Sequence, residues 1–186
     1  MKKAKLKFEA HPAATLLQLD LGTVNGLRKP AGFLGVDTVK GDAVDLVCDL
    51  TKHWQWKDNS VDEVQSIHLI QQFTPEQRVH FVNELYRVLK PGAKAVIYTP
   101  YWASSCAYGN LKNCWPPVTE HWYPHLNKAW REQFDPHGMS YRCDFDHTLG
   151  YALHPSLATR NQEYQQHAIT FFKEAAQDLC ATVTKR

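Results

Sequence analysis

Short apolar runs alternate with polar turns through the first hundred residues, and this alternation constrains the fold more than any other feature of the sequence. Runs of this length, bounded by turn residues, are typical of buried β-strands. We therefore expect strands at Thr15–Leu21, Gly32–Asp37, Ala43–Leu50, Ser60–His68 and Ala93–Thr99.

A helix is expected between the last two of these runs, over Pro75–Lys90. Proline suits the first turn of a helix, and apolar residues at helical spacing form one stripe along the segment. The stripe consists of Val79, Val82, Leu85 and Leu89, and Pro91-Gly92 should end the helix. Strands that alternate with helices predict an α/β fold, Rossmann-like, with a mostly parallel sheet and helices on both faces.

The predicted sheet is trimmed on one side. Only eleven residues, Gly22–Gly32, separate the first two strands, and only Thr38–Asp42 separate the second from the third. Because a parallel connection usually takes about a dozen or more residues, we expect the helices after the first and second strands to be missing.

The second half of the chain has a different composition. Residues 100–140 are rich in Trp, Tyr, His, Pro and Asn and show no sustained period. We expect a strand at Tyr141–Phe145, a long helix from Ser156 to about Asp178 and a last strand at Ala181–Thr184. The apolar face of this helix would carry Tyr164, Ala168, Phe171, Ala175 and Leu179.

The bulk composition is that of an ordinary globular domain. The chain has 186 residues, 44% of them hydrophobic, and a net charge of +2 that neither favours nor excludes nucleic acid. No apolar run approaches the ~20 residues of a membrane span, and the basic start lacks the apolar stretch of a secretion signal. The five cysteines include no C-x-x-C pair, which favours a reducing, cytoplasmic location and gives no zinc framework.

Each predicted strand ends at a polar residue. In an open α/β sheet ligands bind beyond the carboxyl ends of the strands. Asp37, after the second strand, is placed to accept hydrogen bonds from two ribose hydroxyls, and Asp49, after the third, from an exocyclic amine such as that of adenine. Gly22 and Gly26 would let the backbone approach a ligand without a Cβ in the way.

The order "LDLG…GFLGVD…VCDL…DNSVDEVQSIHLIQQF…ELYRVLKPGAKAVIYTP" resembles the class I S-adenosylmethionine-dependent methyltransferases. The most specific piece is Glu84–Gly92, "ELYRVLKPG", and the resemblance covers roughly residues 15–102. The remainder is similar to a subset of small methyltransferase-like proteins often encoded by bacteriophages, which would place the protein in a host cytoplasm.

The resemblance implies that the cofactor is S-adenosylmethionine, and it assigns roles to particular positions. Asp20, Gly22 and Gly26 would lie beside the methionine moiety, Asp37 at the ribose, Asp49 and Leu50 at the adenine, and His68 near the reacting methyl. The chain departs from the family pattern at two places. Val24 stands where a second glycine is usual, and Gln71-Gln72 stand where Glu-His is frequent.

The expected activity is methyl transfer to a small molecule or a polymer end group. An acceptor that carries a hydroxyl or an amine needs a base within hydrogen-bond reach. The candidates for this catalytic role are His68, Tyr101, His121 and Asp146.

Two other hypotheses remain open. The first is an inactive methyltransferase-like fold that works as a binding or interaction protein with a protein partner, as Val24 and the missing helix suggest. The second is a metal-dependent enzyme that uses the histidines His121, His125, His137, His147 and His154, although none of their spacings is diagnostic of a metal site. The tetrapeptide Thr99–Trp102 is similar to a motif of DNA amino-methyltransferases, but the absence of a basic stripe disfavours nucleic acid.

We interpret the whole chain, residues 1–186, as a single domain with three segments. Residues 15–102 would form the cofactor-binding core, and residues 156–186 a terminal helix and strand. The aromatic and histidine-rich segment 103–155 would cover one face of the sheet or form a lid over the acceptor.

Overall fold

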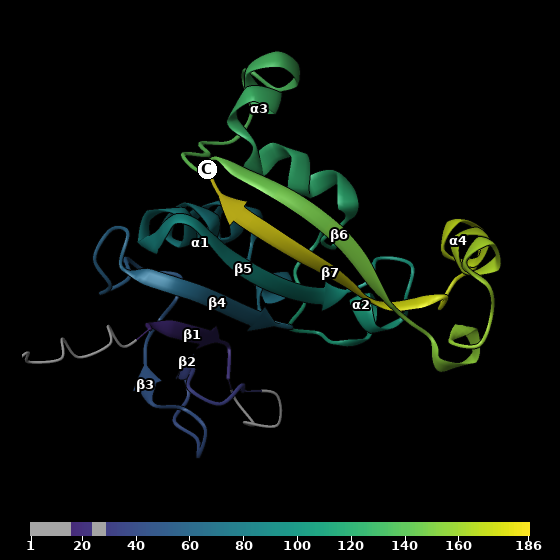
Figure 1. The fold of residues 1–186 in the computed structure, drawn as a ribbon, viewed down its shortest axis with the longest axis horizontal. Coiled ribbons are helices and arrows are strands. Elements are labelled where there is room, and N and C mark those ends of the chain that lie inside the picture. Colours follow the sequence, from purple (N-terminus) through teal and green to yellow (C-terminus); the bar gives the residue numbers. More distant parts are fainter. Residues whose placement is uncertain (1–15, 24–28) are drawn as a thin grey trace, which may run out of the picture.

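The computed structural model describes residues 16–23 and 29–186 and contains one seven-stranded sheet. The strand order is β3-β2-β1-β4-β5-β7-β6 (Figure 1). The strands are β1 (Gln18–Leu21), β2 (Leu34–Asp37), β3 (Leu46–Val47), β4 (Val61–Ile67), β5 (Leu89–Pro100), β6 (Phe145–Leu153) and β7 (Ala176–Lys185).

The first five strands are parallel, and β7 is antiparallel to both β5 and β6. The predicted Rossmann-like, mostly parallel α/β fold is therefore confirmed, with an antiparallel hairpin at one end. All the carboxyl ends of β1 to β5 lie at the same edge of the sheet, which we call the carboxyl edge. The start of β7 lies at this edge too, because Asp178 is paired with Pro100.

The helix α1 (Pro75–Val88) follows β4. It begins with a capping box, in which the Thr74 side chain accepts from the backbone of Gln77 and the Gln77 side chain accepts from the backbone of Thr74. Val82 and Leu85 are fully buried, which confirms the predicted apolar stripe. The helix ends at Val88, two residues earlier than predicted, because Leu89 already begins β5.

The remaining helices are short. They are α2 (Cys106–Gly109), α3 (Lys128–Phe134), α4 (Gln162–Phe171) and the 3-10 helices η1 (Ile70–Gln72), η2 (Glu120–Leu126) and η3 (Pro155–Leu157). No helix connects β2 to β3, as predicted, and residues 38–45 are all described. The connection from β1 to β2 includes residues 24–28, which lie outside the described residues.

Two predictions for the end of the chain are wrong. Residues 141–144 are irregular, and the strand begins only at Phe145. The long helix predicted for residues 156–178 is limited to α4, and β7 begins at Ala176. Ala175 and Leu179 continue the helical spacing of apolar residues after Phe171, although they do not belong to α4. From Leu179 onward, alternate residues of β7 are buried, and the pairing with β5 and β6 decides the conformation of this segment.

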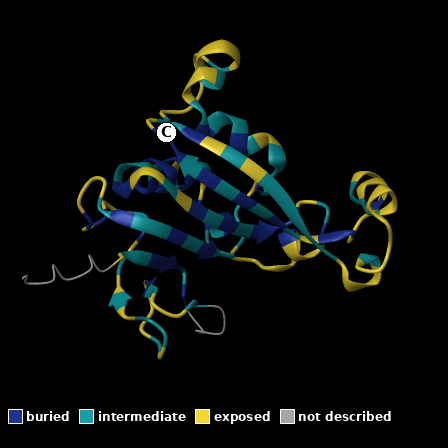
Figure 2. Cartoon of the chain, viewed as in Figure 1, coloured by how far each residue is buried: buried dark blue, intermediate teal, exposed yellow. Residues whose placement is uncertain are grey.

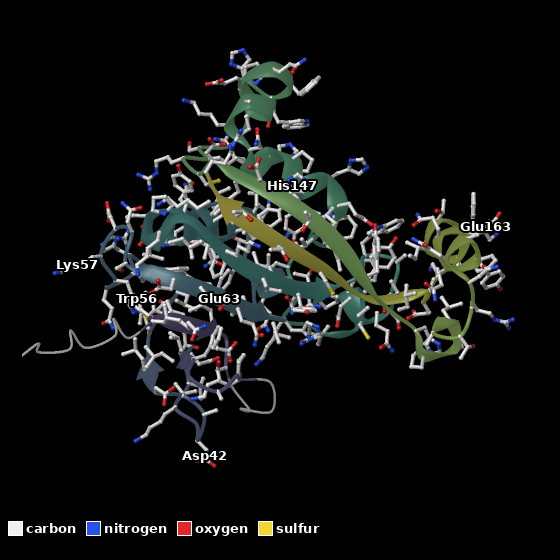
Figure 3. The ribbon with its side chains drawn as sticks, viewed as in Figure 1. Asp42, Trp56, Lys57, Glu63, His147 and Glu163 are labelled. Atoms are coloured by element: carbon white, nitrogen blue, oxygen red, sulfur yellow. The ribbon has the colours of Figure 1, made fainter. Side chains whose placement is uncertain are left out.

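The core lies along the sheet, and exposed residues gather on α3, α4 and the connection from β2 to β3 (Figure 2). Asp42 of this connection and Glu163 of α4 mark two segments that project from the sheet (Figure 3). The fully buried side chains include Trp54, Phe81 and Phe145.

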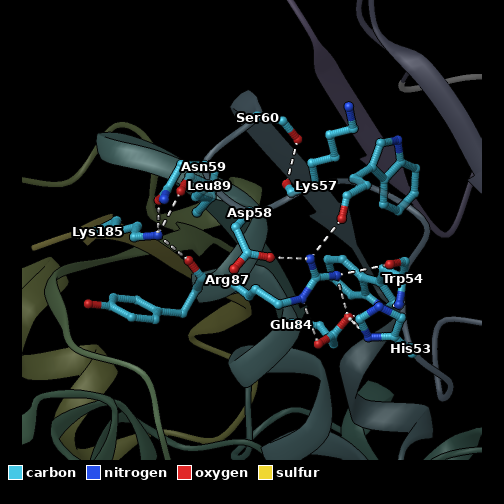
Figure 4. Close-up of polar contacts among 12 residues, drawn as sticks. His53, Trp54, Lys57, Asp58, Asn59, Ser60, Glu84, Arg87, Leu89 and Lys185 are labelled. Atoms are coloured by element: carbon cyan, nitrogen blue, oxygen red, sulfur yellow. Dashed lines mark hydrogen bonds and ion pairs between the residues drawn. The ribbon is translucent and has the colours of Figure 1, made fainter.

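A polar network closes the edge of the sheet opposite the carboxyl edge. Arg87, near the end of α1, donates to the Glu84 carboxylate at 2.7 and 3.0 Å and to Asp58 at 2.8 Å (Figure 4). Nearby, Nζ of Lys185 donates to Asn59 and to two backbone carbonyls at 2.6–2.8 Å. These contacts fasten the end of β7 and the loop before β4 to the end of α1.

Candidate functional site

The carboxyl edge carries a pocket of about 630 Å³ beside β1, β2 and β4. A volume of this size is typical of a site for a small ligand. Of the residues predicted to contact a cofactor, the structure places six at the pocket: Asp20, Gly22, Asp37, Asp49, Leu50 and His68. The seventh, Gly26, lies outside the described residues.

Asp20 lies in β1 with only 5% of its surface exposed. Its Oδ1 accepts from Nε2 of Gln65 at 3.1 Å, and its Oδ2 accepts from the Thr23 hydroxyl. Among the described residues, no lysine or arginine forms an ion pair with this carboxylate. The sheet therefore holds a buried carboxyl group at the pocket in a fixed orientation, with no ion-pair partner among the described residues.

Gly22 follows β1 with a φ of +90°, a conformation that favours glycine. Its N–H donates to the carbonyl of Val36 at 2.8 Å. A Cβ at this position would lie 3.0 Å from the Cβ of Leu69. Only glycine fits this turn without strain, so the backbone itself forms part of the pocket wall.

Asp37 ends β2 and is buried, with 7% exposed. Its Oδ1 accepts from the backbone N–H of Val39 at 3.0 Å and from the Thr38 hydroxyl at 3.3 Å. Both hydrogen bonds use Oδ1 and orient the side chain at the pocket wall. Oδ2 takes part in neither of these two hydrogen bonds.

Asp49 is exposed at the pocket, and the next residue, Leu50, is buried. The Asp49 Oδ1 accepts from the hydroxyl and the N–H of Thr51 at 2.6 and 2.9 Å. These hydrogen bonds lower the pKa of Asp49 and outweigh the opposing effect of burial, and the charges of Lys52 and His80 add a smaller lowering. The acid is therefore ionised at neutral pH.

The cations at the pocket are Lys29 and Lys112. The Lys29 ammonium is 2.7 Å from Asp45, an acid that is not part of the pocket wall. Of the two lysines that line the pocket, Lys112 is therefore the one that is not paired with an acid in this way, and Lys52 acts on Asp49 from outside the pocket wall. The electrostatic field of the pocket favours a ligand that carries positive charge.

His68 comes directly after β4, at the carboxyl edge. Its φ is +54°, in the left-handed region. Its ring Nε2 lies 2.7 Å from Oδ1 of Asp178, near the start of β7. Sequence reasoning found His68 and missed Asp178, because the apolar spacing around residue 178 indicated a helix rather than a strand that returns to this edge.

The buried Arg78 of α1 positions another part of the pocket that sequence reasoning missed. Its guanidinium donates to four backbone carbonyls, those of Ile70, Gln71, Cys114 and Pro116, at 2.6–3.2 Å. These bonds hold residues 114–116 against η1 and bring the nearby Lys112 to the pocket.

The other three candidate bases do not line the pocket. Tyr101 is 3% exposed, and its hydroxyl donates to the carbonyl of Ile169 at 3.4 Å, while burial and the charge of Glu120 raise its pKa. His121 is exposed in η2. Asp146 pairs with Arg186 at 3.4 Å near the amino end of β6, at the edge opposite the pocket. We therefore do not carry these three residues forward as bases.

The histidine-rich segment does not assemble a metal site in the part of the chain that the structure describes. No group of three or more His, Cys, Asp or Glu residues there is placed to hold an ion. The predicted metal-dependent enzyme thus has no geometric support.

No described helix is long and apolar enough to cross a membrane.

Residues 13–97 match a protein family described as "Methyltransferase domain". None of the curated proteins compared matches the chain. The resemblance of the second half to bacteriophage proteins stays a prediction.

Solved structures share the fold. A SAM dependent methyltransferase from Archaeoglobus fulgidus is 18% identical, with a TM-score of 0.65 over 92% of this chain and 87% of that one. An S-adenosylmethionine dependent methyltransferase from Mesorhizobium loti is 12% identical, with a TM-score of 0.58 over 92% and 91%. A third match, from a complex between the Haloferax volcanii Trm112 methyltransferase activator and the putative methyltransferase, is 17% identical, with a TM-score of 0.50 over 92% and 83%.

Proposed function

We propose that the protein is an S-adenosylmethionine-dependent methyltransferase that acts on a small molecule or a polymer end group, on the premise that residues 13–97 match the family described as "Methyltransferase domain". The observation that carries the proposal is the pocket at the carboxyl edge. Acids at the ends of three neighbouring strands and a glycine turn meet at one cavity.

The residues of this pocket fit S-adenosylmethionine. The ligand carries positive charge on its sulfonium and its amine, and the pocket offers the buried Asp20 carboxylate without a cationic partner among the described residues. The turn at Gly22 leaves room where a side chain would stand. When bound, S-adenosylmethionine supplies an electrophilic methyl group.

We assign the contacts as follows. Asp37 would hold the ribose hydroxyls, since its Oδ2 is not engaged in the turn that fixes Oδ1. Asp49 and Leu50 would contact the adenine, the first through its carboxylate and the second through its apolar surface. Asp20 and Gly22 would bind the methionine moiety, and His68 would lie beside the acceptor.

In such a reaction the protein mainly aligns the two reactants and excludes water between them. Fixed orientations of Asp20 and Asp37 serve this alignment, because neither side chain has to reorganise when a ligand arrives. His68 is the candidate base that remains at the pocket after Tyr101, His121 and Asp146 are placed elsewhere.

Isothermal titration calorimetry of the intact protein with S-adenosylhomocysteine and with adenosine tests the proposal. Residues 22–23 and 29–33, the described parts of the β1–β2 connection, are not helical. We therefore expect binding in the micromolar range or weaker, about −8 kcal/mol or less favourable. Adenosine should retain much of this affinity. Heat changes equal to the dilution control for both ligands would refute the proposal.

A second candidate function, a binding protein without catalysis, is favoured by one feature. The segment after β5 exposes large apolar side chains, with Tyr108 53%, Trp115 75% and Leu111 100% exposed. Exposed apolar residues that lie close together mark interaction sites in many proteins. The same titration distinguishes the two functions, because a binding protein of this kind need not retain affinity for S-adenosylhomocysteine.

A further inference from the structure

His68 and Asp178 form a hydrogen-bonded pair that joins two distant parts of the chain at the carboxyl edge. Nε2 of His68 lies 2.7 Å from Oδ1 of Asp178. Their side chains are 40% and 17% exposed, so the imidazole is open to the pocket and the carboxylate is largely covered. Among the described residues, His68 alone is within ion-pair distance of Asp178.

The backbone of His68 is held in an uncommon conformation. A φ of +54° lies in the left-handed region, which a residue with a side chain adopts only rarely. The neighbouring structure imposes it from both sides. The His68 N–H donates to the carbonyl of Tyr98 at 2.9 Å, and the His68 carbonyl accepts from Nε2 of Gln72 at 2.9 Å. Strained positions that the surroundings over-determine are frequent at functional sites.

Asp178 is held just as firmly, because its backbone lies between two strands. It is paired with Pro100 of β5 and with Ala152 of β6. The titratable group nearest on the same strand is Cys180, whose pKa is raised by burial and by the charge of Asp178. The carboxylate is therefore fixed in position relative to β4, where His68 follows.

We propose that Asp178 is a positioning residue that makes His68 a proton acceptor, and that the methyl acceptor is therefore a group that must lose a proton during transfer, a neutral hydroxyl or amine. This inference rests on the proposed function. The Asp178 carboxylate accepts the Nε2 proton of His68, so Nδ1 keeps its lone pair and is the ring nitrogen left for the acceptor. The carboxylate also stabilises the imidazolium that forms when Nδ1 takes a proton.

The chemistry of the step selects the acceptor class. The acceptor oxygen or nitrogen forms the new bond to the methyl carbon while its proton moves to Nδ1 of His68. The C–S bond of the sulfonium breaks, and its electron pair stays on sulfur as a neutral thioether. A carboxylate is already anionic near neutral pH and needs no such base, whereas an alcohol, a phenol or an amine does.

The tautomer of His68 is the first test. In nitrogen-15-labelled protein near neutral pH, long-range proton–nitrogen spectra should show His68 protonated at Nε2 and not at Nδ1, with or without S-adenosylhomocysteine. In Asp178→Asn this preference should be lost. In Asp135→Asn, which changes the other His–Asp pair (His125–Asp135, 3.5 Å), the His68 tautomer should not change. A parent His68 with a proton on Nδ1 would overturn the inference.

The acceptor class is the second test, with ethanol, methylamine and acetate as probes. We expect S-adenosylhomocysteine to form from S-adenosylmethionine faster with ethanol or methylamine than with acetate, and this rate to fall at least about tenfold in Asp178→Asn but not in Asp135→Asn. Asp178→Glu should restore part of the rate. Turnover with acetate alone, or with none of the three, would overturn this assignment of the acceptor class.

The two proposals fail in different ways. If the parent protein binds S-adenosylhomocysteine but His68 has the wrong tautomer, the proton-accepting pair is refuted and the methyltransferase proposal stands. If His68 carries its proton on Nε2 as expected but no S-adenosyl ligand binds, the proposed methyltransferase function is refuted, and the acceptor assignment that rests on it is refuted too.

Discussion

At the scale of single residues, the pocket acids differ in how the protein holds them. Asp20 is buried and bonded through both of its oxygens, whereas Asp37 and Asp49 are each bonded through Oδ1 in a short turn. Asp37 is buried as well. A substitution of Asp37 thus removes both a turn contact and a ligand contact, and the two effects have to be separated.

Asp37→Ala should weaken the binding of S-adenosylhomocysteine by about 1.5–3 kcal/mol, because a charge-assisted hydrogen-bond pair to the ribose is lost. Asp37→Asn retains an Oδ1 acceptor for Val39 and should weaken binding with a smaller change in melting temperature. The matched control is Asp146→Ala, an exposed acid at the opposite edge. Equal affinity in all three variants and the parent, measured by calorimetry, would refute the ribose assignment.

The strand-end acids could be predicted from sequence, because the carboxyl ends of parallel strands meet at one edge whatever the details of the loops. Asp178 could not be predicted in the same way. It reaches the site on an antiparallel strand, and nothing in the local pattern indicates that the chain turns back there. Tyr101 and Asp146 were wrongly grouped with the pocket because their positions depend on the packing and direction of single strands.

At the scale of elements, α1 is the part of the fold that sequence reasoning described best. Its start at Pro75 and its buried stripe follow from local signals, namely the proline and the apolar spacing, and the structure adds the Thr74 cap. The helix at the end of the chain was overpredicted because β7 gains its conformation from pairing with β5 and β6. The spacing of apolar residues along the sequence does not show which strands a segment will pair with.

Leu85→Ala should destabilise the protein by about 2–5 kcal/mol, because Leu85 is fully buried and the change leaves a cavity. Urea denaturation measures the free energy of unfolding. Leu111→Ala is the matched control, since Leu111 is 100% exposed and the same substitution there should change stability very little. A similar effect of both substitutions would contradict the packing of α1.

At the scale of the whole molecule, the two edges of the sheet have different tasks. The carboxyl edge carries the pocket and the His68–Asp178 pair, and the opposite edge carries the network of Arg87 and Glu84. Burial alone would raise the pKa of Glu84. Hydrogen bonds from Arg87 and from the N–H of Trp54, with the charges of Arg87 and His53, outweigh it and lower the pKa from 4.5 to about 2.

Acid should therefore destabilise the protein through Glu84. A carboxyl whose pKa is lower in the folded state stabilises the fold above its unfolded pKa, and this contribution is lost as the pH falls towards the folded pKa. We expect a loss on the order of 3 kcal/mol between about pH 5 and pH 2. Glu84→Gln should remove most of this pH dependence, and Glu163→Gln, an exposed acid on α4, should not. Parallel pH profiles of the parent and Glu84→Gln would contradict this.

If the carboxyl edge of the sheet binds an S-adenosyl ligand, a titration of labelled protein with S-adenosylhomocysteine should move the backbone amide signals of that edge. We expect shifts concentrated at residues 20–23, 37–39, 49–51 and 67–69, with little change at the opposite edge around Asp146 and Thr184. Shifts confined to α4 or to the segment 102–116, or no shifts at saturating ligand, would contradict binding at this edge.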